Sequence, residues 1–180
     1  RVANTPSVTV PSGMPANPRA FEQPPEITRR FFPDPDIEFP TPALSRSKGF
    51  TTQLELLAFI EQLSKRSTAL HKRELTRTVR GRSIPILVFA RSADGMPATV
   101  AASGRPTVWI HAQQHGDEPA AGEAALAVAW ALTDSLSWLL DRINVVIVPR
   151  VNPDGAAKHE RHAANRMDVN RDSMRMLLAE

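Results

Sequence analysis

The stretch of sequence that decides the fold is residues 106–151, PTVWIHAQQHGDEPAAGEAALAVAWALTDSLSWLLDRINVVIVPRV. Its first seven residues form an apolar run that predicts a buried strand. Residues 143–151 form a second apolar run, of the kind that parallel sheets bury on both faces. The segment between them, residues 118–134, is rich in alanine and predicts a helix. Its proline, Pro119, falls in the first turn, where proline is tolerated. A strand, a helix and a strand with short connections predict an α/β domain.

Upstream of this unit the sequence predicts one helix and a pair of strands. Thr52 and Glu55 have the spacing of a capping box, which predicts the start of a helix. The predicted apolar face of this helix consists of Leu54, Leu57, Ala58 and Leu63. Residues 73–92 predict two short strands joined by a turn at Gly81. At the other end of the chain, residues 173–180 predict the beginning of a last helix.

Proline is concentrated near the N-terminus, where ten of the 16 prolines lie within the first 42 residues. Each proline removes a backbone donor and restricts the residue before it, so residues 24–42 are not expected to form a helix. We predict a Pro-rich N-terminal extension over residues 1–48, partly disordered, and a globular domain over residues 49–180. Apolar side chains predict that residues 24–48 lie extended on that domain, with a plain linker as the alternative. They are Phe31, Phe32, Ile37 and Phe39.

The composition excludes several classes of protein. Hydrophobic residues make up 42% and charged residues 23%, as in ordinary globular proteins, and no apolar run is long enough to span a membrane. The net charge of +3 is small and the arginines are scattered, so nucleic-acid binding is not expected. The absence of cysteine excludes disulfides and cysteine-ligated zinc. The chain begins with Arg1 and shows no signal-peptide pattern, which indicates a processed or excised segment and leaves a removed export signal open.

Residues with metal-binding and anion-binding chemistry come after both predicted strands of the opening stretch. His115 and Glu118 come after the first strand, and both side-chain types suit zinc. Their spacing alone is weak evidence, because Glu118 could serve only as a carboxylate at a helix N-terminus and His115 as an ordinary loop residue. Ligands in open α/β sheets bind beyond the carboxyl ends of the strands, which is where both residues lie.

The segment after the second strand, residues 152–172, is rich in arginine and asparagine. Arginine presents a planar fork of donors that suits a carboxylate, and asparagine adds neutral donors. The candidates are Arg161, Asn165, Arg166, Asn170 and Arg171. This loop could hold an anionic substrate, although the composition alone favours a solvated basic loop.

Three motifs taken together, HAQQHGDEPAAGEAAL, NPDGAA and RHAANRMDVNRD, resemble the zinc carboxypeptidase family in their order and separation. The segments PDPDIEFPTPA, GFTTQLELLAFIEQL and GRSIPILVFA resemble bacterial members, so the resemblance covers roughly residues 24–180. It implies a three-layer α/β fold with a mixed, largely parallel central sheet flanked by helices. By the same resemblance this chain is the N-terminal part of the catalytic domain.

The resemblance also implies a role for individual residues. His115 and Glu118 match the first two ligands of a single zinc ion. Arg161 matches the arginine that polarises the scissile carbonyl, and Asn170 and Arg171 match the pair that grips the terminal carboxylate of the substrate. The implied activity is zinc-dependent hydrolysis of a C-terminal peptide bond. The implied substrate is a peptide or peptidoglycan peptide with a free carboxylate.

The sequence departs from the family pattern downstream of Arg171. The family needs a third histidine ligand and a general-base glutamate in that region, and commonly a tyrosine, but this sequence ends nine residues after Arg171 and has no tyrosine. One of His159 and His162 could approach a metal, but the family loop does not use them in this way. We therefore expect the third zinc ligand to lie beyond residue 180. We expect the complete parent protein to be active and the 180-residue chain alone to be inactive. Ala163, where relatives often carry asparagine, leaves the substrate preference open.

Two other functions remain open at this point. A zinc deacylase of N-acyl amino acids, of the desuccinylase or aspartoacylase type, uses a similar histidine and glutamate start and an Asn-Arg pair. A non-catalytic domain that still binds carboxylates through Asn170 and Arg171 is the second alternative. Relatives with a Pro-rich beginning are often exported, which suggests a periplasmic or extracellular location without assigning one.

Overall fold

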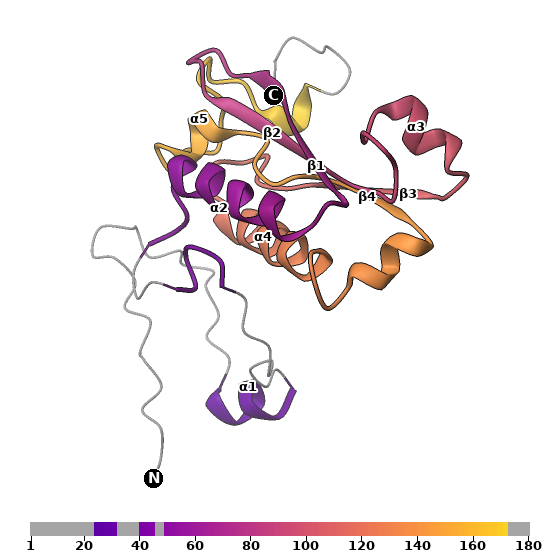
Figure 1. Ribbon diagram of the computed structural model, residues 1–180. Helices are drawn as coiled ribbons and strands as arrows, with labels where there is room; N and C mark the ends of the chain where they lie inside the picture. The colour runs from indigo at the N-terminus through magenta and orange to yellow at the C-terminus, as the bar shows by residue number, and fades with distance from the viewer. Residues whose placement is uncertain (1–23, 32–39, 46–48, 173–180) are drawn as a thin grey trace. The chain divides into compact units, whose positions relative to one another are not determined.

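The computed structural model describes residues 24–31, 40–45 and 49–172 (Figure 1), and its contacts divide the chain into a unit of residues 1–38 and a unit of residues 39–180. In the first unit the described residues include helix α1, Pro25–Phe31. The prediction that residues 24–42 contain no helix was therefore wrong. Proline is compatible with the first turn of a helix, where its missing N–H would have no intrahelical partner.

Other predictions for the ends of the chain lie outside the described residues. These are the tail at residues 1–23, the packing of Phe32, Ile37 and Phe39, and the helix at residues 173–180. The boundary at residue 48 stays a prediction. None of the helices in the described ranges is long and apolar enough to cross a membrane.

The second unit is built on a four-stranded sheet in the order β1, β2, β4, β3. Strands β1 (Leu70–Arg77) and β2 (Ser83–Phe89) pair antiparallel across the predicted turn, and β2 pairs antiparallel with β4 (Asn144–Val148). Strand β3 (Thr107–His111) pairs parallel with β4. The α/β fold with a mixed central sheet that the sequence predicted is confirmed, and among the described strands one of the three pairings is parallel.

Helices α2 (Gln53–Arg66) and α4 (Pro119–Leu132) cover one face of this sheet (Figure 1). The predicted capping box is present: Thr52 N donates to the Glu55 carboxylate at 2.8 Å, and Glu55 N donates to Thr52 Oγ1 at 3.3 Å. The predicted apolar face was right for Leu63, which is buried, and for Leu57, which packs against the core. It was wrong for Leu54, which is 79% exposed, and for Ala58, which is also exposed. The side chains of α2 that enter the core are Leu56, Phe59, Ile60 and Leu63.

The opposite face of the sheet is partly covered by the short helix α3 (Pro97–Ala102), whose Val100 packs with Val88 and Val146. Strand β4 lies between β2 and β3 and is buried along its whole length, as predicted. The strand predicted at residues 106–112 is present as β3, but the prediction that it is buried was wrong. In the described sheet β3 is an edge strand, and its Trp109 is 58% exposed.

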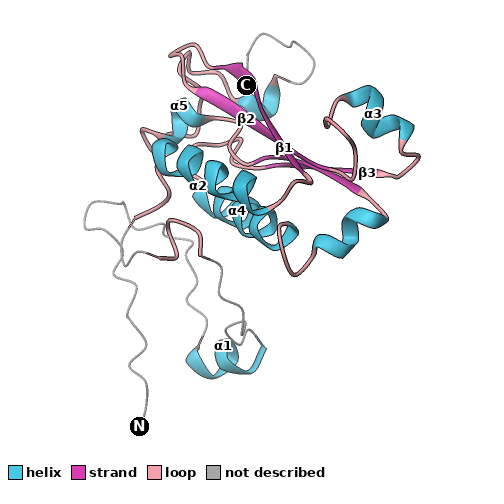
Figure 2. Ribbon diagram, in the orientation of Figure 1, coloured by secondary structure: helices cyan, strands magenta, loops and turns pink. Residues whose placement is uncertain are grey.

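The parallel pairing of β3 and β4 brings their carboxyl ends to the same edge of the sheet. The segments after these two strands are held together by backbone bonds, since Val151 N donates to Ala112 O at 2.9 Å and Asn152 N donates to Gln113 O at 3.1 Å. Both segments are mainly loop, and the segment after β4 also contains short helical turns (Figure 2). The turns after β4 are α5 (Pro153–Ala156) and η2 (Val169–Arg171), and η1 (Ser137–Asp141) precedes β4.

Candidate functional site

The loop after β3 and the loop after β4 touch at two glycines. A Cβ atom on Gly116 would overlap the backbone of Gly155, Ala156 and Glu160. A Cβ atom on Gly155 would lie 2.7 Å from the carbonyl oxygen of Glu160. Because no side chain fits at either position, the two loops pack backbone against backbone.

We expect Gly116→Ala to lower the free energy of unfolding by about 3 kcal/mol, because the overlapping atoms are backbone atoms and cannot turn away as a side chain would. The measurement is urea denaturation of the two proteins. Gly104→Ala is the matched control, since Gly104 has a positive φ of 66° but open space around it, and should cost about 1 kcal/mol. Equal losses in the two variants would contradict the close approach of the loops.

A buried arginine, Arg150, is hydrogen-bonded to the loop after β3. Arg150 is 4% exposed; its Nε donates to Gln113 Oε1 at 2.6 Å and its Nη2 donates to Thr51 O at 2.7 Å. Gln113 has a positive φ of 50°, and its amide nitrogen donates to Gly116 O at 3.1 Å. Burial lowers the pKa of the Arg150 guanidinium from its usual value, and the nearby carboxylate of Glu123 acts in the opposite direction. Arg150 therefore fixes the backbone that carries His115.

His115 lies between two carboxylates. Its Nδ1 is 2.9 Å from Glu118 Oε1, and its Nε2 is 3.1 Å from Asp168 Oδ1. The ring is buried, whereas the Glu118 side chain is 59% exposed. Glu118 is the N-cap residue of α4, and it faces the imidazole instead of capping the helix with its side chain.

Arg161, in the loop after β4, contacts both carboxylates of the cluster. Its Nε and Nη2 donate to Asp168 Oδ2 at 3.1 and 3.0 Å, and its Nη1 is 3.8 Å from Glu118 Oε1. Partial burial raises the pKa of the Asp168 carboxyl, but the hydrogen bonds from Arg161 and His115 outweigh burial, and the pKa lies below its usual value. Asp168 is therefore an anion that binds both the imidazole and the guanidinium.

Sequence reasoning missed Asp168. The signal that could have identified it is its place, two residues before Asn170 in a loop beyond a strand end. Its carboxylate also accepts from Asn170 N at 3.0 Å, which caps η2. Asp168 thus joins the His115 cluster to the turn that carries the Asn-Arg pair.

The other predicted residues lie at the margin of this cluster. Asn170 and Arg171 are exposed on η2, and Arg171 Nη1 donates to the carbonyl oxygen of Asn170 at 3.0 Å. Of the two histidines beside Arg161, His159 packs its ring against Phe50, with 5.6 Å between ring centroids. In the described residues no set of three histidine, aspartate or glutamate side chains is arranged to hold a metal ion.

Two donors nevertheless suit zinc. Ligands bound to one zinc ion at about 2.0 to 2.2 Å lie roughly 3 to 3.5 Å apart. The separation of 2.9 Å between His115 Nδ1 and Glu118 Oε1 is close to this range. An imidazole and a carboxylate are also a common donor combination for zinc. These residues fit two positions of a zinc site, and the described residues do not supply a third.

Comparison with known proteins assigns the chain to a family. The sequence model for zinc carboxypeptidases matches residues 56–175. The chain is 27% identical to Carboxypeptidase 2 of Trichophyton tonsurans over 135 residues, 72% of this chain and 24% of that protein. It is 28% identical to Carboxypeptidase SOL1 of Arabidopsis thaliana over 142 residues, 75% of this chain and 28% of that protein. It therefore spans about a quarter of the length of these relatives.

A solved structure gives the same result. The metallo-carboxypeptidase from Burkholderia cenocepacia aligns with a TM-score of 0.54 and 29% identity, over 67% of this chain and 32% of that one. The region matched by the family model includes the sheet, both loops and the cluster around His115. The chain belongs to the zinc carboxypeptidase family.

Proposed function

We propose that the complete protein containing this chain hydrolyses the C-terminal peptide bond of a peptide or peptidoglycan peptide with the help of one zinc ion. The observation that carries the proposal is the convergence of His115 Nδ1 and Glu118 Oε1, 2.9 Å apart, beside the guanidinium of Arg161. Membership of the zinc carboxypeptidase family supports the same reaction class.

His115 and Glu118 would be the first two ligands of the ion. The Asp168 carboxylate, 3.1 Å from His115 Nε2, would accept the Nε2–H, which would fix the tautomer and leave the lone pair of Nδ1 for the metal. A bound zinc ion would polarise the carbonyl and lower the pKa of a bound water. This arrangement gives Asp168 the task of positioning the imidazole.

Arg161 would stabilise the negative charge that develops on the carbonyl oxygen. Two of its nitrogens are held by Asp168, and Nη1 faces the metal-ligand side of the cluster, 3.8 Å from Glu118 Oε1. A cation held in place before the reaction needs little reorganisation in the transition state. Asn170 and Arg171, exposed on the adjoining turn, would bind the terminal carboxylate of the substrate.

The third ligand and the general base are proposed to come from polypeptide outside the described residues, with the third ligand beyond residue 180. Two ligands alone bind zinc weakly, and without a positioned base the proton of the attacking water has no acceptor. The 180-residue chain on its own is therefore proposed to be inactive.

An assay on two substrate classes tests the reaction type. The complete protein is offered hippuryl-type peptides and, separately, N-acyl amino acids. We expect release of the C-terminal amino acid from the peptides. Hydrolysis of the N-acyl amino acids alone would replace this proposal with the deacylase activity. If neither substrate class were hydrolysed, the protein would instead be a non-catalytic domain that binds carboxylates.

We expect Arg171→Ala to raise the KM for peptides with a free C-terminus by about tenfold or more, while kcat changes little. Loss of one fork of hydrogen bonds to a charged group removes roughly 1.5 to 3 kcal/mol of binding free energy. The measurement is steady-state kinetics on the complete protein. Arg142→Ala, an exposed arginine before β4, is the control, and an unchanged KM in Arg171→Ala would show that this arginine does not grip the substrate.

A further inference from the structure

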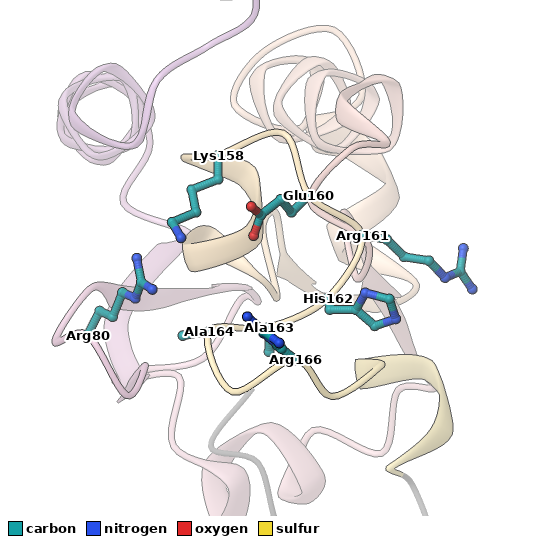
Figure 3. Close-up of a pocket in the computed structure, with 8 residues that line it drawn as sticks. All are labelled: Arg80, Lys158, Glu160, Arg161, His162, Ala163, Ala164 and Arg166. Atoms are coloured by element: carbon teal, nitrogen blue, oxygen red, sulfur yellow. The ribbon is translucent and has the colours of Figure 1, made fainter. Parts of the chain in front are cut away.

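A hollow of about 630 Å³ lies beside the His115 cluster, between the β1–β2 turn and the loop at residues 158–166 (Figure 3). Arg80 from the turn and Lys158 and Arg166 from the loop line it, and one carboxylate, Glu160, lies among them. Figure 3 shows the charged ends of Arg80 and Lys158 directed toward one another, whereas Arg161 is directed away from this group.

The three cations of the hollow are not neutralised by neighbours. Arg80, Lys158 and Arg166 are exposed, and no described residue accepts a hydrogen bond or forms an ion pair with any of their side chains. Arg161 is different, because Asp168 binds its guanidinium. With Glu160 as the one carboxylate of the lining, the hollow keeps a positive charge that an anion would offset.

Hydrogen bonds fix the walls that carry these cations. The fully buried Asp154 carboxylate accepts from Arg82 Nη1 at 2.6 Å and from Arg80 N at 3.3 Å, which ties the β1–β2 turn to α5. The carbonyl oxygen of Gly155 accepts from Lys158 N and Glu160 N, both at 3.0 Å. The backbone around the hollow is therefore fixed before a ligand binds, which reduces the conformational entropy lost on binding.

Arg166 is held in an uncommon backbone conformation. Its φ is 66°, a region that non-glycine residues rarely adopt. Arg166 N donates to Ala163 O at 2.9 Å, and Met167 N donates to Asn165 Oδ1 at 3.0 Å, so the turn itself enforces this conformation. The turn brings a third cation to the lining of the hollow.

We propose that this hollow is a subsite for an acidic side chain of the peptide substrate, an aspartate or glutamate close to the cleaved bond. The inference rests on the proposed function. Arg161 lines the hollow, and its guanidinium, which is directed away from the other cations of the hollow, belongs to the His115 cluster, so the hollow adjoins the proposed reacting centre. Glu160 inside the hollow repels a phosphate dianion more strongly than a single carboxylate, which favours a side chain over inorganic phosphate.

Direct binding tests the subsite without requiring catalysis. Two fluorescent peptides with the same C-terminal residue carry either two glutamates or two glutamines before it, and their affinities for the chain are measured by fluorescence anisotropy at low ionic strength. We expect the glutamate peptide to bind about tenfold more tightly, because each exposed ion pair contributes a few-fold. Added salt should reduce the preference.

The variant Lys158→Gln/Arg166→Gln should bind the two peptides equally. The matched control, Lys65→Gln/Arg142→Gln, removes the same charge from exposed positions at the end of α2 and before β4, and should keep the preference. Equal affinity of the unaltered chain for both peptides, or the same loss in the control, would overturn the proposal. Competition by inorganic phosphate with no discrimination between the peptides would assign the hollow to a free anion and overturn it as well.

Kinetics on the complete protein separate this inference from the proposed function. Release of the C-terminal residue from both peptides with equal KM would reject the subsite and keep the carboxypeptidase. Tighter binding of the glutamate peptide with no cleavage of either peptide would keep the anion site and reject its place in a carboxypeptidase. A lower KM for the glutamate peptide that disappears in Lys158→Gln/Arg166→Gln would support both.

Discussion

The complete protein carrying His115→Ala or Glu118→Ala is expected to lose its zinc and its hydrolytic activity together. The two side chains are the converging donors of the cluster, with Nδ1 and Oε1 2.9 Å apart. Removing one of three protein ligands leaves two, and two ligands bind zinc too weakly to retain it through purification. Activity should fall to the level of the metal-free protein, because the residues that remain do not replace the metal.

The measurement is zinc content per protein by mass spectrometry, alongside peptide hydrolysis. Asp117→Ala is the matched control, because Asp117 is an exposed carboxylate next to Glu118 that forms no described side-chain contact with the cluster. It should keep both metal and activity. A full complement of zinc in either His115→Ala or Glu118→Ala would remove that residue from the ligand set.

Arg161→Ala is expected to lower kcat by about a hundredfold to a thousandfold while zinc stays bound. That is the size of the loss when a single donor to a developing oxyanion is removed, about 3 to 4 kcal/mol of transition-state stabilisation. In the structure Arg161 contacts the ligand-bearing side of the cluster through Nη1 and is oriented by two bonds to Asp168. Its loss should therefore affect the reaction more than the binding of the substrate.

Single-turnover kinetics together with the zinc content distinguish this role from a structural one. Arg161→Lys keeps the charge but loses the fork that Asp168 holds, and it should recover only part of the rate. If Arg161→Ala released the metal, Arg161 would serve to hold the cluster together. If kcat were unchanged, the oxyanion would have to be stabilised by another group.

The sequence predicted the proximity of those candidate residues whose placement depends on strand order and on local spacing. His115 and Glu118 are three residues apart in one loop, and the parallel pairing of two apolar strands was enough to place them opposite the loop that holds Arg161. The same reasoning predicted the capping box of Thr52 and Glu55, because both partners are close in sequence. Local patterns of this kind need no knowledge of the tertiary packing.

The features that the sequence could not predict depended on contacts between distant residues. Asp168 acts on His115 from 53 positions away, and its place two residues before Asn170 indicates a candidate site residue but not the identity of that partner. The burial of Trp109 was overestimated because the sequence pattern of an apolar strand at the edge of a sheet does not differ from that of a central strand. The helix α1 was missed because the prolines of residues 24–42 were all treated as helix breakers, although Pro25 lies in a first turn, where proline is tolerated, as it is at Pro119.

The edge position of β3 has a consequence for handling the chain. Within the described residues no strand pairs with its outer side, so backbone donors and acceptors along Thr107–His111 stand open to solvent. Natural sheets protect such edges with lysine, proline or a bulge, but this strand reads Thr-Val-Trp-Ile-His and carries no lysine or carboxylate. We therefore expect two copies to be able to pair along this edge. The 180-residue chain should self-associate as its concentration rises, and dilute solution is the condition in which single molecules persist.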